Sequence, residues 1–392
     1  MKTLKRTWAD ISLDNLEYNY RSIRAHLPQG TKFLGVMKAD AYGHGAVPVS
    51  RALADLGAEY LAVSNLEEAV QIRRGEVRLP ILILGYTPAE YAANMIFLDI
   101  TQEVHSLEYA RELNEALAGT NYILNVHLKL DTGMTRIGFF AYDNERTLDE
   151  LRQVAQLPHL HIEGAFMHFC VADSRAEADV SFTKLQYKRF MDMLSAMAGV
   201  GIRPEIRHCC NSGATILYPE FALDMVRPGI ITYGNAPSDE LEGALSLRPM
   251  MSLHSMIAQV RTVPAGTDIS YGRLYRTKEE TRVAVLPIGY ADGLSRLLTG
   301  KASFYLQGHQ VPVIGRICMD MCMIDVSNVP EAKPGDVVTI FGYDDDGTLL
   351  PCERLARAQG TINYELLCQI SKRIPRICHR GAETSQILQY IV

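Results

Sequence analysis

The chain has 392 residues, of which 47% are hydrophobic and 21% charged, and its formal net charge is −6. This length predicts two domains with a large core, and the composition is typical of a soluble globular protein. A negative net charge without long runs of one sign excludes the basic surface that nucleic acids require. We therefore expect a small-molecule substrate and no nucleic acid partner.

The predicted elements begin with an amphipathic helix at 13–26. Between residues 33 and 233, eight short apolar or β-branched runs alternate with segments of helical period, a pattern typical of βα units and a parallel sheet. The intervening helices are expected at 66–73, 107–117, 144–156 and 181–198. The eight runs begin at Phe33, Tyr60, Pro80, Ile96, Ile123, Ile162, Glu205 and Met225. Eight parallel strands close a TIM barrel, so we predict an α/β fold with a (β/α)8 barrel.

After about residue 240 the pattern changes to strand-like runs such as RVAVLPIGYA and DVVTIFGY, separated by Pro/Gly turns. We predict a barrel domain at 1–240 and a β-rich C-terminal domain at 241–392. The segment DDDG at 344–347 lacks the remaining ligands of a metal loop, so it predicts a hairpin turn and no metal site.

The N-terminus and the cysteines favour a cytoplasmic location. The start MKTLKRTWAD lacks the apolar stretch of an export signal, and no apolar run approaches the ~20 residues that cross a bilayer. Eight scattered cysteines without zinc-finger spacing fit reduced thiols. We expect neither export nor a membrane span.

Polar residues that close the barrel strands are the first candidates for a site, because TIM-barrel active sites lie at the C-terminal ends of the strands. They are Lys38, Lys129, Asp131, His168, Asn211, Ser212 and Arg227. Lys38 follows an apolar strand and precedes a glycine-rich turn, where partial desolvation would lower its pKa and free the amine to form a Schiff base. Each candidate also has a structural reading: a solvated strand end for Lys38, a core histidine for His168, and a turn arginine for Arg227.

The segment around Lys38, VMKADAYGHG, resembles the pyridoxal-phosphate lysine motif of the alanine racemases. Five further segments match that family in the same order: LDTGMTRIGF, VRPGIITYG, ISYGRLYRT, GRICMDMCMIDVS and GTINYELLCQISKRIPR. Together they cover almost the whole chain. The resemblance implies a fold-type III pyridoxal 5'-phosphate enzyme of the bacterial cytoplasm, an isomerase that interconverts L- and D-alanine and supplies D-alanine for peptidoglycan.

The resemblance also implies two bases. Lys38 holds the cofactor as an aldimine and is the base that deprotonates the D-enantiomer, while Tyr271 is the base that deprotonates the L-enantiomer. Racemisation removes a proton from one side of Cα and returns one to the other, which two bases on opposite faces explain directly. An unperturbed tyrosine has a pKa near ~10, so His168 and Arg227 are expected to favour the phenolate.

Cofactor and substrate contacts follow from the same resemblance. Arg227 is placed against the pyridine nitrogen, which stays unprotonated because arginine keeps its proton; this weakens the electron sink and limits side reactions. The substrate carboxylate is assigned to Arg136 and the backbone at Met319, beside Tyr271. Lys129 is either carboxylated, orienting Arg136, or an ammonium paired with Asp131 or another carboxylate. The cofactor-binding set is Lys38, Tyr42, His168, Asn211, Ser212, Arg227, Gly229, Ile230 and Tyr364.

Three departures from the family pattern lie near the cofactor: Met167, Cys170 and the run CCNSG at 209–213. They leave serine or a broader range of amino acids open as substrates, although the bulk of Tyr364 favours alanine. The resemblance places Tyr271 and Met319 against the other subunit's barrel, which implies a homodimer with shared active sites.

Two rival interpretations remain. A decarboxylase of the same fold type carries a carboxylate at the pyridine nitrogen and a catalytic cysteine in a GxxCD-type segment, so Arg227 and the absence of that segment tell against it. A non-catalytic pyridoxal-phosphate carrier consists of the barrel alone, so residues 240–392 tell against it.

Overall fold

The computed structural model describes residues 6–142 and 144–391, and its contacts divide the chain into two compact units. The barrel unit comprises Leu16–Ala41 and Ala46–Arg248, and the sheet unit comprises the chain up to Asn15, the segment Tyr42–Gly45 and the chain from Pro249 onward. The predicted domain boundary at residue 240 stays a prediction.

The barrel unit is built on parallel strands in the order β10-β2-β3-β4-β5-β6-β8-β9. The two ends of this order are joined by backbone hydrogen bonds, since the amides of Asp224 and Arg227 donate to the carbonyls of Arg207 and Cys210 at 3.1 and 2.9 Å. The sheet therefore closes on itself, which confirms the predicted TIM barrel. Its strands are β2 (Lys32–Val36), β3 (Tyr60–Val63), β4 (Ile81–Ile83), β5 (Ile100–Val104), β6 (Leu124–Asp131), β8 (Leu160–Phe166), β9 (Ile206–His208) and β10 (Met225–Val226), with the short β7 (Phe139–Phe140) added beside β6.

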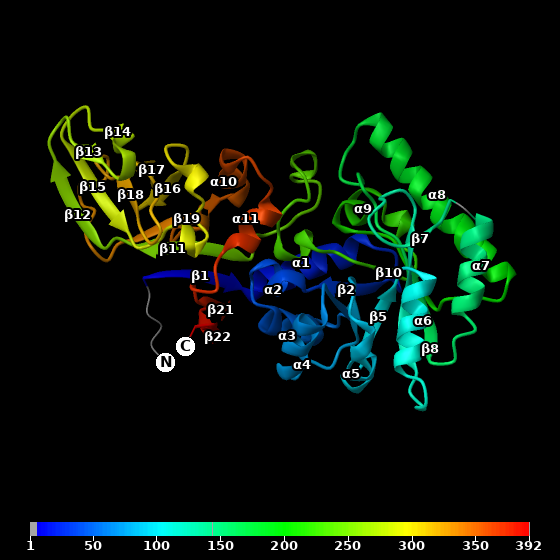
Figure 1. The fold of residues 1–392 in the computed structure, drawn as a ribbon. Helices are drawn as coiled ribbons and strands as arrows, with labels where there is room; N and C mark the ends of the chain where they lie inside the picture. The colour runs from blue at the N-terminus through cyan, green and yellow to red at the C-terminus, as the bar shows by residue number, and fades with distance from the viewer. Residues whose placement is uncertain (1–5, 143, 392) are drawn as a thin grey trace. The chain divides into compact units, whose positions relative to one another are not determined.

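Helices surround these strands (Figure 1). Two begin at side-chain caps that the sequence supplies: Asn65 accepts the Glu68 amide at the start of α4, and Ser106 accepts the Tyr109 amide at the start of α6. The predicted helices are present with ends shifted by a few residues. They are α1 (Leu13–His26), α4 (Leu66–Arg74), α6 (Leu107–Ala116), α7 (Asn144–Val154) and α8 (Glu177–Gly199). The sequence pattern did not predict α3 (Ala46–Leu56), α5 (Ala92–Phe97) and α9 (Ser212–Leu217).

One predicted strand start is wrong. The fourth apolar run was expected to begin its strand at Ile96, but Ile96 lies in α5 and β5 begins at Ile100. Between them Asp99 adopts a left-handed conformation with φ 52°, which separates the helix from the strand. A short apolar run does not by itself distinguish a buried helix end from a strand.

The sheet unit is dominated by strands, which confirms the expected β-rich C-terminal part. Its large sheet has the order β12-β15-β18-β17-β16-β19-β11-β1-β21-β22. The N-terminal β1, which the sequence pattern did not predict, lies between β11 (antiparallel) and β21 (parallel). The strands of this sheet are β1 (Thr7–Ser12), β11 (Met251–Met256), β12 (Gln259–Val263), β15 (Thr281–Leu286), β16 (Ser303–Leu306), β17 (His309–Ile314), β18 (Cys322–Asp325), β19 (Val337–Tyr343), β20 (Leu349–Leu350), β21 (Arg376–Arg380) and β22 (Glu383–Leu388).

Smaller elements complete the sheet unit. The hairpin of β13 (Asp268–Ile269) and β14 (Tyr275–Arg276) stands apart from the large sheet, and the helices are α10 (Cys352–Gln359) and α11 (Asn363–Gln369). The predicted turn at 344–347 connects the antiparallel strands β19 and β20, with the Thr348 amide donating to the Asp344 carboxylate, so the hairpin is confirmed. Within the described ranges, no helix combines the length and apolar character needed to cross a membrane.

Candidate active site

Lys38 lies where the chain leaves β2 and enters a left-handed turn, α2 (Lys38–Tyr42). Ala39, Asp40 and Ala41 have φ of 52 to 55° and ψ of 46 to 49°. Each L-residue in this region costs roughly 1–2 kcal/mol, so other contacts must hold the turn. The lysine that the sequence singled out therefore stands at the C-terminal end of a barrel strand, in backbone geometry that local preference alone would not produce.

Two carboxylates hold this turn. The Ala39 amide donates to Glu68 Oε1 at 2.7 Å, and Glu68 Oε2 accepts the Ser64 amide at 2.8 Å. The Asp40 carboxylate accepts the Ala46 amide at 2.8 Å. Glu68 belongs to α4, so the helix after the next strand fixes the backbone directly after Lys38.

Arg227 is buried at the end of β10 and donates only to neutral acceptors. Its Nη1 donates to His208 Nδ1 at 3.0 Å, and its Nη2 donates to the carbonyls of Met167 and Cys209 at 2.7 and 3.1 Å and to His168 Nδ1 at 3.4 Å. Its Nε–H has no hydrogen-bond acceptor among the described residues. Burial lowers the pKa of Arg227 to about 10, so the guanidinium remains protonated at neutral pH and can only donate.

His168 follows β8 and is neutral. Burial, and next the charges of Arg227 and Lys129, hold its pKa well below the usual range. Because Arg227 donates to Nδ1, we assign the remaining ring proton to Nε2, where it can be donated to a ligand.

Short donors converge near the start of α9. The Gly229 amide donates to Ser212 Oγ at 2.9 Å, and the Ile230 amide has no acceptor among the described residues. Asn211 caps α9 by accepting the Ala214 amide at 3.0 Å. A hydroxyl and two neighbouring amides form the kind of donor group that binds phosphate at a barrel end.

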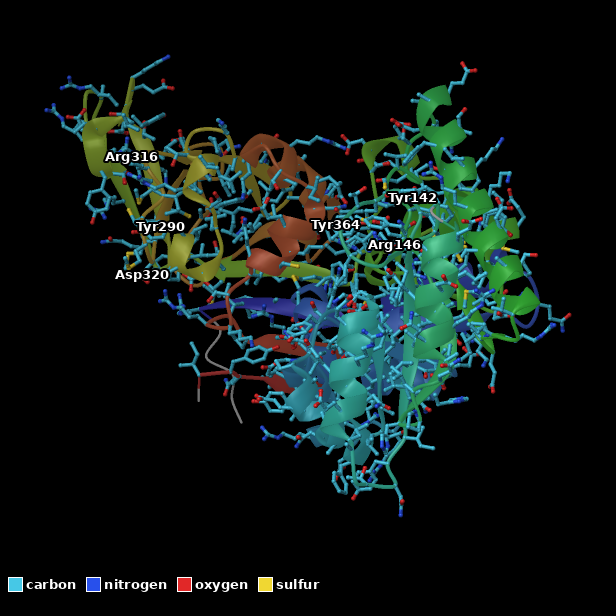
Figure 2. The ribbon with its side chains drawn as sticks, turned by 45° about the vertical axis from the view of Figure 1, so that its right-hand side comes forward. Tyr142, Arg146, Tyr290, Arg316, Asp320 and Tyr364 are labelled. Atoms are coloured by element: carbon cyan, nitrogen blue, oxygen red, sulfur yellow. The ribbon has the colours of Figure 1, made fainter. Side chains whose placement is uncertain are left out.

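The two tyrosines predicted for the phosphate belong to the sheet unit. The rings of Tyr42 and Tyr364 have centroids 5.9 Å apart, and Tyr364 lies on α11 (Figure 2). Tyr42 is buried, and this burial raises the pKa of its hydroxyl, which therefore stays a phenol.

Lys129 and Asp131 lie at the end of β6 but do not form the ion pair considered from the sequence. Asp131 Oδ1 accepts the amides of its own loop at Gly133, Met134 and Thr135, at 2.9 to 3.1 Å. Lys129 donates to the Leu130 carbonyl at 3.2 Å and pairs with no carboxylate that the structure describes. Burial and the charge of Arg227 lower the pKa of Lys129 to about 8.

Arg136 lies beyond this loop and is exposed. Its guanidinium makes no hydrogen bond with a described residue, so its paired donors are available to a carboxylate.

Tyr271 is in the sheet unit and is 69% exposed. It begins the 3-10 turn η5 (Tyr271–Arg273) directly after Ser270, whose φ is 66°. Together with Asp268 and Cys318 it lines a cavity of about 440 Å³. The phenol of Tyr271 is therefore largely exposed on its own unit.

Met319 belongs to the loop between β17 and β18. Its carbonyl accepts the Ala291 amide at 3.0 Å, while its own amide has no acceptor in the described part of the chain. Gly289 permits this packing, because a Cβ there would lie 2.3 Å from the Met319 carbonyl oxygen. Figure 2 shows Tyr290, Arg316 and Asp320 on the same side of this unit.

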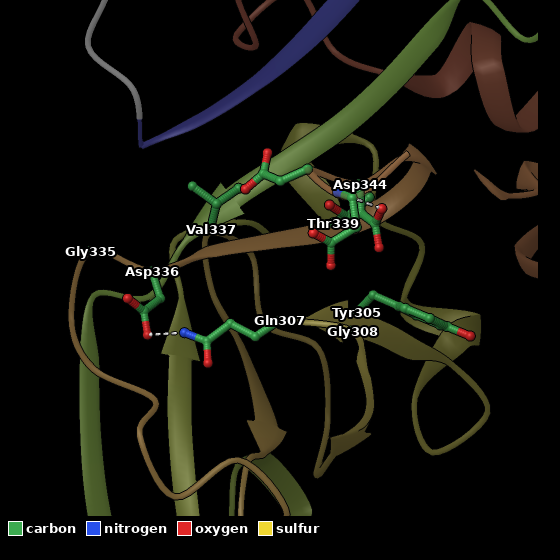
Figure 3. A pocket seen from close by; sticks show the side chains of 10 residues that line it. Tyr305, Gln307, Gly308, Gly335, Asp336, Val337, Thr339 and Asp344 are labelled. Atoms are coloured by element: carbon green, nitrogen blue, oxygen red, sulfur yellow. Dashed lines mark hydrogen bonds between the residues drawn. The ribbon is translucent and has the colours of Figure 1, made fainter. Parts of the chain in front are cut away.

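Another cavity of the sheet unit, about 470 Å³, is lined by Asp336 and by Asp344 to Asp346 (Figure 3). It contains none of the predicted site residues. Among residues 6–142 and 144–391, no three His, Cys, Asp or Glu side chains are grouped so as to hold a metal ion.

Sequence analysis missed three residues that are connected to Arg227: His208, His127 and Glu163. Their signal was present, since each is a polar residue inside a predicted barrel strand. Polar side chains at alternate positions of β6, His127 and Lys129, face the same side of the strand.

Comparison with known proteins gives the same assignment along the whole chain. Residues 11–237 match the model of the alanine racemase N-terminal domain, and residues 250–378 match that of the C-terminal domain. The chain belongs to the alanine racemase family. It is 46% identical to the alanine racemase of Desulfovibrio desulfuricans over 94% of this chain and 97% of that protein. It is 42% identical to that of Clostridium tetani over the full length of both.

Solved alanine racemases have the same fold. The enzyme of Clostridium difficile 630 superposes with a TM-score of 0.94 at 40% identity, with 100% of both chains covered. The Bacillus anthracis enzyme with bound L-Ala-P superposes with a TM-score of 0.92 at 34% identity, covering 100% of this chain and 99% of that one.

Alanine racemases depend on pyridoxal 5'-phosphate, and the barrel unit has groups that fit it. Lys38 offers an amine at the strand end, the Nε–H of Arg227 suits a ring nitrogen that accepts, and Ser212, Gly229 and Ile230 suit the phosphate. Every group in this set donates or is an amine, which matches a polyanionic cofactor with an unprotonated ring.

Proposed function

We propose that this alanine racemase interconverts L- and D-alanine by two-base proton transfer, with Lys38 and Tyr271 on opposite faces of the substrate. The observation that carries the proposal is the buried Arg227, whose neighbours are all neutral acceptors and whose Nε–H is available. A decarboxylase of the same fold type, the alternative interpretation, would carry a carboxylate there. When bound, pyridoxal phosphate supplies an aldehyde for the amino group and an electron-withdrawing ring that acidifies the α-hydrogen.

In this proposal Lys38 Nζ takes the α-proton of D-alanine and the Tyr271 hydroxyl oxygen takes that of L-alanine. Each returns a proton in the reverse direction, so one residue acts as base while the other acts as acid. Arg227 donates and never accepts, so it would hold the ring nitrogen of the cofactor unprotonated; a ring held in this way would withdraw electrons less strongly, which would favour racemisation over transamination.

The phosphate is assigned to the Ser212 hydroxyl, the amides of Gly229 and Ile230, and the hydroxyls of Tyr42 and Tyr364. Asn211 supports this group as the cap that orients α9. The substrate carboxylate is assigned to Arg136 and the Met319 amide, both without an acceptor among the described residues.

We propose that Lys129 is carboxylated. Carbon dioxide adds to a neutral amine, and the lowered pKa of about 8 makes this form accessible. Arg227 and Arg136 both act to lower that pKa by their positive charge, so a negative group at Lys129 would replace repulsion with attraction. The carbamate would then orient Arg136.

We further propose that the chain forms a homodimer in the bacterial cytoplasm, with Tyr271 and Met319 of one subunit serving the site of the other. The exposure of Tyr271 supports this arrangement. The described cysteines, which are all eight of the chain, form no disulfide, as expected in a reducing compartment. The D-alanine produced would serve peptidoglycan synthesis.

The direct test is to purify the protein, record the absorption of bound pyridoxal phosphate, and follow optical rotation with L-alanine, L-serine and L-lysine separately. We expect alanine to be racemised fastest, because Tyr364 crowds the space beyond a methyl group. Equal rates with serine would favour a broad-specificity racemase.

Variants separate the two bases. Lys38→Ala should abolish racemisation without added amine, and Tyr271→Phe should slow proton removal from L-alanine far more than from D-alanine, followed by loss of α-deuterium. Equal losses from both enantiomers in Tyr271→Phe would refute the two-base assignment.

A further inference from the structure

A chain of hydrogen bonds runs from Arg227 through two buried histidines to a carboxylate. Arg227 Nη1 and His208 Nδ1 are 3.0 Å apart, and His208 Nε2 and His127 Nδ1 are 2.8 Å apart. His127 Nε2 lies 2.9 Å from Glu163 Oε2. His208, His127 and Glu163 come from β9, β6 and β8, and Arg227 directly follows β10, so the hydrogen bonds link four neighbouring strands of the barrel.

The direction of every bond in this chain is determined. Arg227 can only donate, so His208 Nδ1 accepts and His208 Nε2 carries the proton. His208 then donates to His127 Nδ1, which leaves the His127 proton on Nε2, facing Glu163. Burial is the largest cause that lowers the pKa of both histidines, so both rings are neutral. One tautomer of each ring satisfies all three bonds.

The series of hydrogen bonds ends at the Glu163 carboxylate, whose negative charge is stabilised by several donors. Glu163 Oε2 also accepts from the Tyr60 hydroxyl at 2.8 Å and from Thr101 Oγ1 at 3.3 Å. These donors and His127 lower the pKa of Glu163 against the opposing effect of its burial. The carboxylate is therefore charged, and its side chain is 20% exposed.

The backbone is adapted to this chain at two places. The pairing of β6 with β8 shifts register between Val126 and His127, which leaves Glu163 as an extra residue in β8. Such bulges re-aim a side chain. The next residue is Gly164, where a Cβ would lie 2.5 to 2.6 Å from three atoms of the His127 ring. The bulge and the glycine together make room for the imidazole beside the carboxylate.

Arg227 needs a counter-charge that does not occupy its donors. It is a buried cation whose hydrogen-bond partners in the described chain are all neutral. Unpaired buried charges are costly, and a carboxylate in direct contact would take up the Nε–H and invite proton sharing. Glu163 is connected to Arg227 through the imidazoles of His208 and His127, which are polarised by the charges at the two ends.

We propose that Glu163, His127 and His208 are positioning residues: they orient Arg227 and stabilise its charge from a distance, which leaves the Nε–H for the pyridine nitrogen. This inference rests on the proposed role of Arg227. If these three residues only stabilised the core, apolar side chains of the same volume would do so at a lower desolvation cost. Buried polar groups stabilise a fold only when each one has a hydrogen-bond partner.

The test compares Glu163→Gln with Glu205→Gln. Glu205 is the control because it is close to Glu163, its amide donating to the Glu163 carbonyl at 2.9 Å, yet its exposed side chain takes no part in these hydrogen bonds. Both variants therefore remove one negative charge, and only Glu163→Gln removes it from the hydrogen-bonded series. The first readout needs no cofactor: 15N NMR of histidine-labelled protein should show Nε2-protonated rings for His127 and His208. Their signals should shift in Glu163→Gln and stay unchanged in Glu205→Gln.

The second readout is binding of pyridoxal phosphate and turnover. Glu163→Gln should weaken cofactor affinity and lower kcat by about tenfold, the scale of one charge-assisted hydrogen bond, while Glu205→Gln stays within about twofold. Glu163→Asp should recover part of the loss. Should Glu163→Gln fail to fold, His127→Phe keeps a ring of similar size but removes both the donor to Glu163 and the acceptor for His208, and is expected to act in the same direction.

Three results would overturn the inference: unshifted histidine signals in Glu163→Gln, equal losses in Glu163→Gln and Glu205→Gln, or unchanged activity in His127→Phe. Arg227→Lys separates this inference from the proposed function. If Arg227→Lys leaves the absorption of bound cofactor unchanged, the role of Arg227 fails. If it alters that absorption and Glu163→Gln does not, only the distant counter-charge fails.

Discussion

At the scale of single residues, the chemistry depends on how burial changes protonation. Lys129 is 4% exposed, and its pKa of about 8 leaves roughly a tenth of its amine neutral at pH 7, far more than for an exposed lysine. The neighbouring Arg227 keeps its proton despite the same burial, because its unperturbed pKa is so much higher. One residue can therefore react with carbon dioxide while the other stays a fixed cation.

We predict that removing carbon dioxide lowers activity. Protein exchanged into carbonate-free buffer should lose activity and recover it when bicarbonate is added. Recovery should be faster as the pH rises through about 8, because carbamate forms on the neutral amine. Lys129→Gln should show no response to bicarbonate at any pH, and a bicarbonate response in that variant would contradict the assignment to Lys129.

At the scale of elements, the glycines and the turns decide where functional side chains point. Gly164→Ala should lower the free energy of unfolding by about 1–3 kcal/mol, because its Cβ would overlap the His127 ring in a packed interior. Urea unfolding measures the loss. Gly199→Ala is the matched control, since it ends α8 with no atom within 4 Å of the added Cβ, and it should be neutral or slightly stabilising. Equal destabilisation by both changes would count against the overlap.

The left-handed turn after Lys38 gives a second test at this scale. Glu68→Ala removes the acceptor of the Ala39 and Ser64 amides and should cost about 1 kcal/mol of stability and weaken cofactor binding. Glu67→Ala, an exposed neighbour in the same helix turn, should change neither. Absorbance titration with pyridoxal phosphate and thermal unfolding measure the two effects. If Glu68→Ala binds the cofactor with unchanged affinity, the turn keeps its conformation without the Glu68 carboxylate.

The sequence pattern predicted the barrel because the apolar strands and amphipathic helices alternate with distinct periods. It missed β1, since a six-residue run such as TWADIS becomes a strand only through pairing with β11 and β21. It missed His127, His208 and Glu163 as a group, because strand register and a bulge bring them together. Lys38 and Arg227 were found as polar residues at strand ends and received their roles from the motif resemblance, but their hydrogen bonds and burial could not be read from the sequence.

At the scale of the whole molecule, the proposed shared sites make a quantitative prediction. A mixed dimer of Lys38→Ala and Tyr271→Phe subunits would contain one site with both changes and one site with neither. Random reassortment gives half mixed dimers, and half of their sites are intact, so about a quarter of wild-type activity should return when two inactive proteins are mixed. Measured racemisation after subunit exchange tests this, with each variant exchanged against itself as the control. No recovery despite proven exchange would place both bases in one subunit.

The position of β1 has a consequence for biosynthesis. This strand leaves the ribosome before the barrel does, yet one of its partners, β21 (Arg376–Arg380), is made only after the barrel. The barrel, whose strands follow chain order, can form while translation continues, whereas the large sheet must wait for β21. A ribosome that stalls before that point would release a chain with a finished barrel and an open sheet edge, the kind of surface that chaperones recognise and that aggregates in their absence.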